Sequence, residues 1–450
     1  MTRRLVQSRG LSVLRWAQSY FHPRRSAAGV VLTCSTLALA GCMFDSGPIY
    51  GSEGAAAAQD SSLRDPALPS AAPPAAVSGR SAPLPPAAGG AAGSNACEPS
   101  ALAVDSDQDG TPDCADRAPF GLRKRLTLDG AQVESTLMNF PVLIRIRDAE
   151  LSAGARPDGS DIHFVAADGT SALDFELESY DPAQGAIVAW VRLPNLIAGV
   201  DAALFVGYGD GKGDRSNARG VWSRYQHVWH FGRDSSFAEP AGIKDSTQRS
   251  HGTAQGGMSG LNSVDAVAGN GSAFDGVDDH ITFDNDFVGI GPSTLGAWVN
   301  QFAGNPEFGG AIIAFGEESM NRARFLFSLD TRIGTTDVGF YSNDLGGSAL
   351  PTDSWHYLVW SWDGLNSSIY LNGVLTTGPT PHAGANTSGR VGAIGASVFS
   401  SAHFLRGQLD EVRIATSARS SGWIATEYEN QRPDSTFIKS IDAEQPIGAP

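Results

Sequence analysis

From Phe120 onward the chain consists of short runs of β-branched and aromatic residues, separated by Gly, Pro, Asp and Asn. Trp355–Trp362 alternates in polarity as a half-buried strand does, and Asn372-Gly373 predicts a two-residue hairpin turn. A helical period appears only over residues 421–430. Many short strands with regular turns predict an all-β fold of two β-sandwich or jelly-roll modules. The clearest early strands are residues 140–146, 161–166, 186–193 and 203–209.

The first 41 residues have the features of an export signal, so they are excluded from the fold. An apolar run from Ala27 to Gly41 follows Arg24-Arg25 and is shorter than the roughly 20 residues of a membrane-spanning helix. It ends in Leu-Ala-Gly-Cys at residues 39–42, which resembles the lipobox of bacterial lipoproteins. That resemblance implies cleavage before Cys42 and lipid on its sulfur. The alternative is an ordinary secretory signal with a chance cysteine.

The net charge of the chain excludes some classes of binding partner. The whole chain carries −16, and the six charged residues of the signal are all arginines, so its removal leaves −22. Such acidity repels nucleic acid, so no nucleic-acid partner is expected. We expect a lipid-anchored protein of the bacterial cell envelope. Met43 in place of aspartate favours the outer membrane or cell surface, since residues after the lipidated cysteine bias sorting in that family.

Residues 42–96 are dominated by Ala, Pro, Gly and Ser. With so few large apolar groups, this stretch cannot offset the entropy lost on ordering. We expect a disordered tether that separates the folded modules from the membrane.

Residues 97–118 contain a calcium-type loop. Counted from Asp105, carboxylates stand at positions 1, 3, 5, 9 and 12, with glycine at position 6 and a backbone carbonyl expected from position 7. Hard oxygen ligands in this number favour a structural Ca²⁺, and the alternative is a solvated acidic turn. The predicted ligands are Asp105, Asp107, Asp109, Thr111, Asp113 and Asp116.

This loop departs from an EF-hand, because its last ligand is Asp and no amphipathic helices flank it. It resembles the type 3 repeats of thrombospondins. Cys97 and Cys114 are an even pair in an oxidising compartment once Cys34 leaves with the signal and Cys42 carries lipid, so a disulfide between them is expected.

Several short motifs stand out within residues 119–218, at residues 123–128, 139–144, 157–164, 175–180 and 189–191. With these motifs the segment resembles a bacterial domain of unknown function, the family numbered 2341. The resemblance implies a β-sandwich and a surface location but no activity. Some family members are fused to proton-channel or biopolymer-transport components.

A second set of motifs lies within residues 222–442, at residues 273–281, 355–357, 370–373, 407–414 and 428–437. With these motifs the segment resembles a laminin-G-like, concanavalin A-like jelly roll, a fold that hosts lectins, adhesion modules and glycosidases. In some members a calcium ion is held by residues that match Asp245 and Asp410 here. The alternative is a structural ion pair of Asp410 or Glu411 with Arg413.

Other conspicuous side chains have ordinary explanations. Aspartates 275, 278 and 279 are expected to shape a turn. Tryptophans 298, 355, 360 and 362 could form a sugar-stacking platform, but their alternating strand positions favour a buried core. Trp222 and Trp229 are likewise expected to pack.

No catalytic constellation is apparent. The sequence has no G-x-S-x-G elbow, zinc-binding H-E-x-x-H or phosphate loop. Strand alternation predicts that Asp410 and Glu411 point to opposite faces, and Glu176 and Glu178 belong to the other module. We therefore expect a non-enzyme that binds glycan or an envelope or extracellular protein. The alternatives are a glycan-processing enzyme and an accessory component of an envelope transport complex.

Overall fold

A computed structural model describes residues 121–447, apart from 233, 305–309, 329–335, 348, 383, 390 and 399–402. The predicted signal, lipid attachment at Cys42, tether, Cys97–Cys114 disulfide and calcium loop all lie outside the described residues. Among the described residues, no helix is long and apolar enough to cross a membrane.

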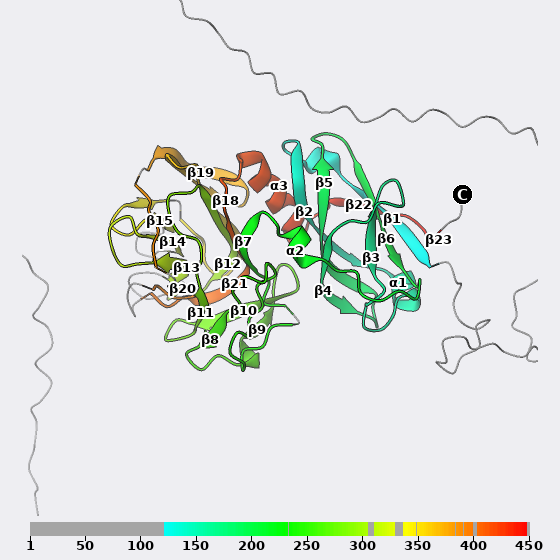
Figure 1. The fold of residues 1–450 in the computed structure, drawn as a ribbon, viewed down its shortest axis with the longest axis horizontal. Helices are drawn as coiled ribbons and strands as arrows, with labels where there is room; N and C mark the ends of the chain where they lie inside the picture. Colours follow the sequence, from blue (N-terminus) through cyan, green and yellow to red (C-terminus); the bar gives the residue numbers. More distant parts are fainter. Residues whose placement is uncertain are drawn as a thin grey trace, which may run out of the picture. The chain divides into compact units, whose positions relative to one another are not determined.

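The first module is a sandwich of two antiparallel sheets (Figure 1). One sheet has the strand order β22-β1-β6-β3, with β23 also paired to β1, and the other has the order β2-β5-β4. Short helices α1 (Ala149–Gly154) and η1 (Gly130–Gln132) connect the strands. The strands are β1 (Leu122–Leu128), β2 (Leu137–Arg147), β3 (His163–Ala166), β4 (Phe175–Asp181), β5 (Ala186–Leu196), β6 (Ala202–Tyr208), β22 (Ile438–Ile441) and β23 (Gln445–Pro446).

Helix α2 (Ala218–Val221) leads into the second module, which is also a sandwich of two antiparallel sheets. One sheet has the order β19-β18-β17-β12-β21-β10-β9, with β7 paired to β21. Its strands are β7 (Tyr225–Trp229), β9 (Ser263–Asp265), β10 (Asn270–Asp275), β12 (Ser293–Gln301), β17 (Trp355–Trp362), β18 (Asn366–Leu371), β19 (Val374–Pro381) and β21 (Arg406–Ala415).

The opposing sheet has the order β16-β15-β14-β13-β20-β11-β8, and helix η2 (Gly260–Asn262) lies between the first strands of the module. The main core of the module, which includes Trp229, Trp360 and Trp362, fills the space between the sheets. The strands are β8 (Thr253–Gln255), β11 (His280–Asp284), β13 (Gly310–Gly316), β14 (Ala323–Ser328), β15 (Thr336–Gly339), β16 (Asp344–Gly346) and β20 (Val391–Ile394).

The C-terminal segment returns to the first module. Helix α3 (Ser421–Gln431) places Trp423 in the core of the first sandwich, and Phe437 joins the same core. Strand β22 then pairs with β1, as the red and cyan strands of Figure 1 show. The predicted jelly-roll range of 222–442 therefore includes residues that the first module uses. Phe437 is buried in the core of the first sandwich, Ile438 and Ile441 pack against that core, and β22 pairs along one edge of β1.

The predicted fold class is confirmed: the described residues are mostly antiparallel strands in two sandwiches. The hairpin at Asn372-Gly373 is also confirmed, with φ values of 50° and 78° that suit a two-residue turn between β18 and β19. The helical period over residues 421–430 corresponds to α3, whose first turn is capped by the Ser420 side chain.

Candidate binding site at the module junction

The two sandwiches are joined by a packed interface. Alternation along β5 directs Ile187, Ala189 and Val191 into the first core, so Trp190 points outward from that sandwich. Trp190 is nevertheless fully buried, because Trp222 and residues of β7 and β21 cover it. This outward face of the first module is therefore an interface rather than a solvent-exposed surface.

Two bulged strands bring carboxylates to this interface. In β4 the pairing with β5 shifts between Leu177 and Ser179, so Glu178 is the extra residue. In β21 the pairing with β12 shifts between Arg413 and Asp410. Within this bulge the backbone of Glu411 has a φ of 54°, a value that residues other than glycine rarely adopt.

The bulge at Glu411 corrects the expectation drawn from simple alternation. Leu409 and Val412 both face the jelly-roll core, although three positions separate them. Asp410 and Glu411 therefore do not point to opposite faces. Both carboxylates are completely buried on the side of the junction, where Glu411 contacts His230 and Arg413. The proposed ion pair of Glu411 with Arg413 is present.

His230 lies at the centre of the cluster, in the loop after β7. Its Nδ1 is 2.7 Å from Oε1 of Glu411 and 3.8 Å from Oε2 of Glu178, and its Nε2 is 3.3 Å from Oε2 of Glu176. The imidazole stacks on the Trp190 indole, with ring centroids 5.6 Å apart. His230 therefore connects carboxylates of both modules.

Indole groups hold the two carboxylates of β4. Trp222 Nε1 donates a hydrogen bond of 2.5 Å to Glu176, and Trp190 Nε1 donates one of 2.9 Å to Glu178. The Ser246 hydroxyl donates to the other oxygen of Glu176 at 2.6 Å. These bonds fix both carboxylates at the junction.

A second set of polar groups lies deeper, around Arg413. Its guanidinium packs over the rings of Trp190 and Trp222, 4.3 and 4.8 Å from their centroids. It also lies 3.5 Å from Glu427 of α3, whose carboxylate accepts hydrogen bonds from Tyr225 at 3.0 Å and Tyr357 at 2.9 Å.

Burial and neighbouring charges shift the pKa values of these groups in different directions. Burial raises the pKa of Glu178 well above its ordinary value, and Glu411 and Asp410 add to the rise. Burial likewise raises the pKa of Asp410, with a further contribution from Glu411. Burial opposes the charge of Glu176, but His230 outweighs it and holds the pKa of Glu176 below its ordinary value. His230 itself has a raised pKa, because Glu411 and Glu176 overcome the effect of burial.

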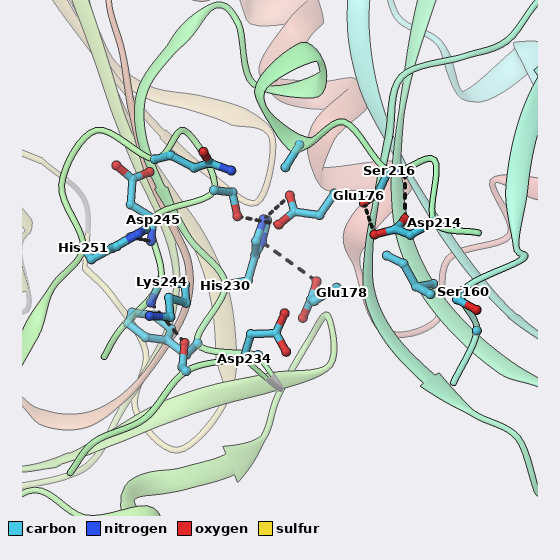
Figure 2. Close-up of a pocket in the computed structure, with 18 of the residues that line it drawn as sticks. Ser160, Glu176, Glu178, Asp214, Ser216, His230, Asp234, Lys244, Asp245 and His251 are labelled. Carbon is cyan, nitrogen blue, oxygen red and sulfur yellow. Dashed lines mark hydrogen bonds and ion pairs between the residues drawn. The ribbon is translucent and has the colours of Figure 1, made fainter. Parts of the chain in front are cut away.

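A cavity of about 430 Å³, lined mostly by polar and charged residues, opens onto this cluster (Figure 2). Figure 2 shows His230 between Glu176 and Glu178 at the centre of the lining. Both modules contribute to the walls, and carboxylates outnumber cationic groups there. The lining consists of Asp158, Gly159, Ser160, Glu176, Leu177, Glu178, Asp214, Ser216, Ala218, His230, Phe231, Gly232, Asp234, Ser235, Lys244, Asp245, Ser246, Gln248 and His251.

The residues predicted for a second calcium site have separate partners. Asp245 accepts hydrogen bonds from Val228 N and Thr247 and lies 2.9 Å from His227 Nδ1, whereas Asp410 accepts from Ala268 N at 2.8 Å. Among the described residues, two groups of three potential metal ligands lie close together, and neither contains Asp245 or Asp410. These groups are Glu178 with His230 and Glu411, and Asp275 with Asp278 and Asp279.

The expectations for the other conspicuous side chains are confirmed, except that Trp355 is not fully buried. The Asp275 carboxylate accepts hydrogen bonds from the backbone N–H groups of residues 277, 278 and 279, as a turn residue does. Trp298, Trp360 and Trp362 are buried, and Trp355 is half-buried. Trp222 and Trp229 are also buried, so none of these rings except Trp355 offers a face to a ligand.

Sequence reasoning missed the junction cluster. In the sequence, Glu176 and Glu178 belong to a different module from Glu411, and the nine histidines, His230 among them, show no metal-ligand spacing. A usable signal was nevertheless present. The motif at residues 175–180 and the motif at residues 407–414 each carry buried-strand residues interrupted by carboxylates, and the structure places these two motifs against each other.

Comparison with known families agrees with the two modules. Residues 158–232 match the profile of the Domain of unknown function (DUF2341), and residues 275–425 match that of the Concanavalin A-like lectin/glucanases superfamily. The chain contains a DUF2341 module and a concanavalin A-like domain. The DUF2341 match continues through β7 to residue 232, so it includes His230 and passes the predicted module boundary at residue 218. No curated protein matches the chain.

Solved structures of low identity also resemble it. Domain 4 of AbnA, a GH43 extracellular arabinanase from Geobacillus stearothermophilus in complex with arabinotriose, is 20% identical, and the match covers 46% of this chain and 98% of that domain with a TM-score of 0.33. Trypanosoma rangeli sialidase with the inhibitor DANA is 13% identical over 51% of this chain and 40% of the sialidase, with a TM-score of 0.35. The SAP-like pentraxin from Limulus polyphemus is 15% identical over 38% of this chain and 92% of the pentraxin, with a TM-score of 0.29.

Proposed function

We propose that this chain is a lipid-anchored protein of the bacterial envelope that binds a glycan, without catalysis, in the cavity between its two modules. The observation that carries the proposal is the polar lining of that cavity, to which both sandwiches contribute. The export signal and the lipobox-like sequence at Cys42 support the location.

The lining selects a ligand rich in hydroxyl groups. Carboxylates and serine hydroxyls accept hydrogen bonds there, and Lys244, Gln248 and His251 donate them. An apolar ligand would leave these groups unpaired, which is costly in a partly closed site. The excess of carboxylates repels an anionic ligand. A neutral glycan, whose hydroxyls both donate and accept, fits both conditions.

One observation favours a second function, glycan hydrolysis. Glu176 and Glu178 both line the cavity, and their pKa values are displaced in opposite directions, as those of a catalytic base and acid are. Three donors already occupy Glu176, and Glu178 is buried and hydrogen-bonded to Trp190, so we place binding first. Release of reducing sugar from a bound glycan, absent in Glu178→Gln, would establish the hydrolase instead.

The proposal is tested by a glycan array probed with the full chain in detergent, once with calcium and once with a chelator. Binding to neutral glycans is expected, and affinity for the strongest hit should fall at least tenfold in Lys244→Ala. The matched control is Lys439→Ala, because Lys439 pairs with Asp201 away from the cavity. An array without binding in either condition would contradict the proposal, and capture of an envelope protein instead would favour a protein partner.

A further inference from the structure

Three potential metal ligands from both modules converge beneath the cavity. One ligand atom each of Glu178, His230 and Glu411 lies within 4.8 Å of the other two, and all three residues are buried. His230 Nδ1 is 2.7 Å from Glu411 Oε1 and 3.8 Å from Glu178 Oε2. Neighbouring ligands of a tetrahedral ion with bonds near 2.0–2.1 Å are about 3.3 Å apart, so these separations need small adjustments to accept one.

Two carboxylate oxygens in the cluster lack a partner. Oε1 of Glu178 and Oδ1 of Asp410 are fully buried without a hydrogen bond. Asp410 lies close enough to Glu178 to raise the pKa of that carboxyl, and Glu411 in turn raises the pKa of Asp410. A buried polar atom without a partner carries a free-energy cost, and native proteins satisfy nearly all such atoms. In Glu178, Oε2 accepts the hydrogen bond from Trp190, whereas no protein group among the described residues uses Oε1, so Glu178 keeps one oxygen for a further ligand.

The groups behind the three residues are arranged as supports for ligands. The Nε2 atom of His230, which faces away from Glu178 and Glu411, lies 3.3 Å from the Glu176 carboxylate. Trp190 holds Glu178 with a hydrogen bond of 2.9 Å, and Arg413 holds Glu411. A histidine that coordinates through one nitrogen and donates to a carboxylate through the other is the usual arrangement at protein metal sites.

We propose that Glu178, His230 and Glu411 bind one divalent transition-metal ion, of the Zn²⁺ or Mn²⁺ class, at the module junction. The mixed imidazole and carboxylate set favours these ions over Ca²⁺, which prefers oxygen ligands alone. Glu178 and His230 line the cavity, so an ion reaches the site from solvent. Since Glu178 comes from β4 and the other two ligands from the second module, the ion joins the modules.

This metal site differs from the predicted calcium sites in its residues and in the ion that it selects. Its test needs no glycan, so the metal proposal and the glycan-binding proposal can fail separately. The test uses the full chain in detergent, stripped of metal with a chelator and titrated calorimetrically with Zn²⁺, Mn²⁺ and Ca²⁺ in turn. We expect a Zn²⁺ or Mn²⁺ site for which Ca²⁺ does not compete, and at least tenfold weaker binding in Glu178→Gln.

Two further variants make the result decisive. Trp190→Phe keeps an aromatic ring but removes the hydrogen bond to Glu178, and should weaken binding about 10- to 100-fold, as the loss of an outer-shell partner does. The double variant Asp275→Asn, Asp278→Asn removes the exposed acidic group and should bind as the wild type does. Circular dichroism checks that each variant is folded.

Cobalt gives the second readout. Co²⁺ bound by His230 and the two carboxylates should show visible absorption that is lost in folded Glu178→Gln. Absence of a Zn²⁺ or Mn²⁺ site, or equal affinity in the wild type, Glu178→Gln and Trp190→Phe, would overturn the proposal. The cluster would then be an ion-pair network alone.

Discussion

The Nε2 atom of His230 lies 3.3 Å from the carboxylate of Glu176, although 54 residues separate them and they belong to different modules. The contact is partly buried, and Trp190, Trp222 and Arg413 lie around it. The two sandwiches therefore share one polar cluster, and the cavity above it exists only where they meet.

The substitution Gly269→Ala tests how closely the backbone of the second module packs against Glu178. The φ of Gly269 is +77°, and a Cβ atom there would lie 2.4 Å from Glu178 Oε1. Gly199 has a similar φ of +73° and nothing within 4 Å. Gly199→Ala should cost about 1–2 kcal/mol of unfolding free energy from backbone strain. Gly269→Ala should cost about 1–3 kcal/mol more from overpacking. Urea unfolding measures both, and equal losses would argue against the close fit.

Glu427 tests the deeper part of the junction. Its carboxylate accepts hydrogen bonds from two buried tyrosines and faces Arg413, so Glu427→Gln should lower the free energy of unfolding by about 1.5–3 kcal/mol. Glu429→Gln is the control in the same helix, because the pair of Glu429 with Arg432 is partly exposed and should contribute at most about 1 kcal/mol. Equivalent destabilisation of the two variants would show that the Glu427 network contributes little.

Asp148 makes stability depend on pH within the first module. Burial alone would raise its pKa, but the hydrogen bond from buried Lys124 outweighs this and holds the pKa below its ordinary value of 3.8. Because the folded pKa is the lower one, the ion pair stabilises the fold above pH 3.8 and its contribution fades as the pH falls through the folded pKa.

Asp148→Asn isolates this effect, since asparagine still caps α1. It should lower the free energy of unfolding by about 1.5–3 kcal/mol at pH 7. The difference from the wild type should shrink as the pH is lowered below the ordinary pKa. Denaturant unfolding at several pH values checks this, with exposed Asp265→Asn as the control. A difference that persists unchanged in acid would refute the assignment.

The predicted calcium loop has its own test. Asp107→Asn combined with Asp109→Asn removes two of the predicted ligands and should abolish binding of radiolabelled calcium by that loop in equilibrium dialysis. The charge-matched control is Asp275→Asn with Asp278→Asn. If both double variants bind the same amount of calcium, the loop is not the calcium site. If a chelator leaves the thermal unfolding temperature of the wild type unchanged, calcium does not stabilise the fold.

The all-β fold, the hairpin at Asn372-Gly373 and the buried tryptophans could be predicted because alternation and turn chemistry are local properties of the sequence. The cluster could not. Simple strand alternation places the side chains of Asp410 and Glu411 on opposite faces of β21. The bulge, with Glu411 in a left-handed backbone conformation, brings both to the same face. The return of β22 to β1 and the burial of Trp190 likewise depend on contacts between distant segments.

Glycan binding in the shared cavity is tested by the dissociation constant of the strongest array hit. It is measured for Ser160→Trp, which fills the cavity from the first module, and for Ser354→Trp, which lies outside it. We expect loss of binding in Ser160→Trp and unchanged affinity in Ser354→Trp. Wild-type affinity in both variants would show that the ligand binds elsewhere.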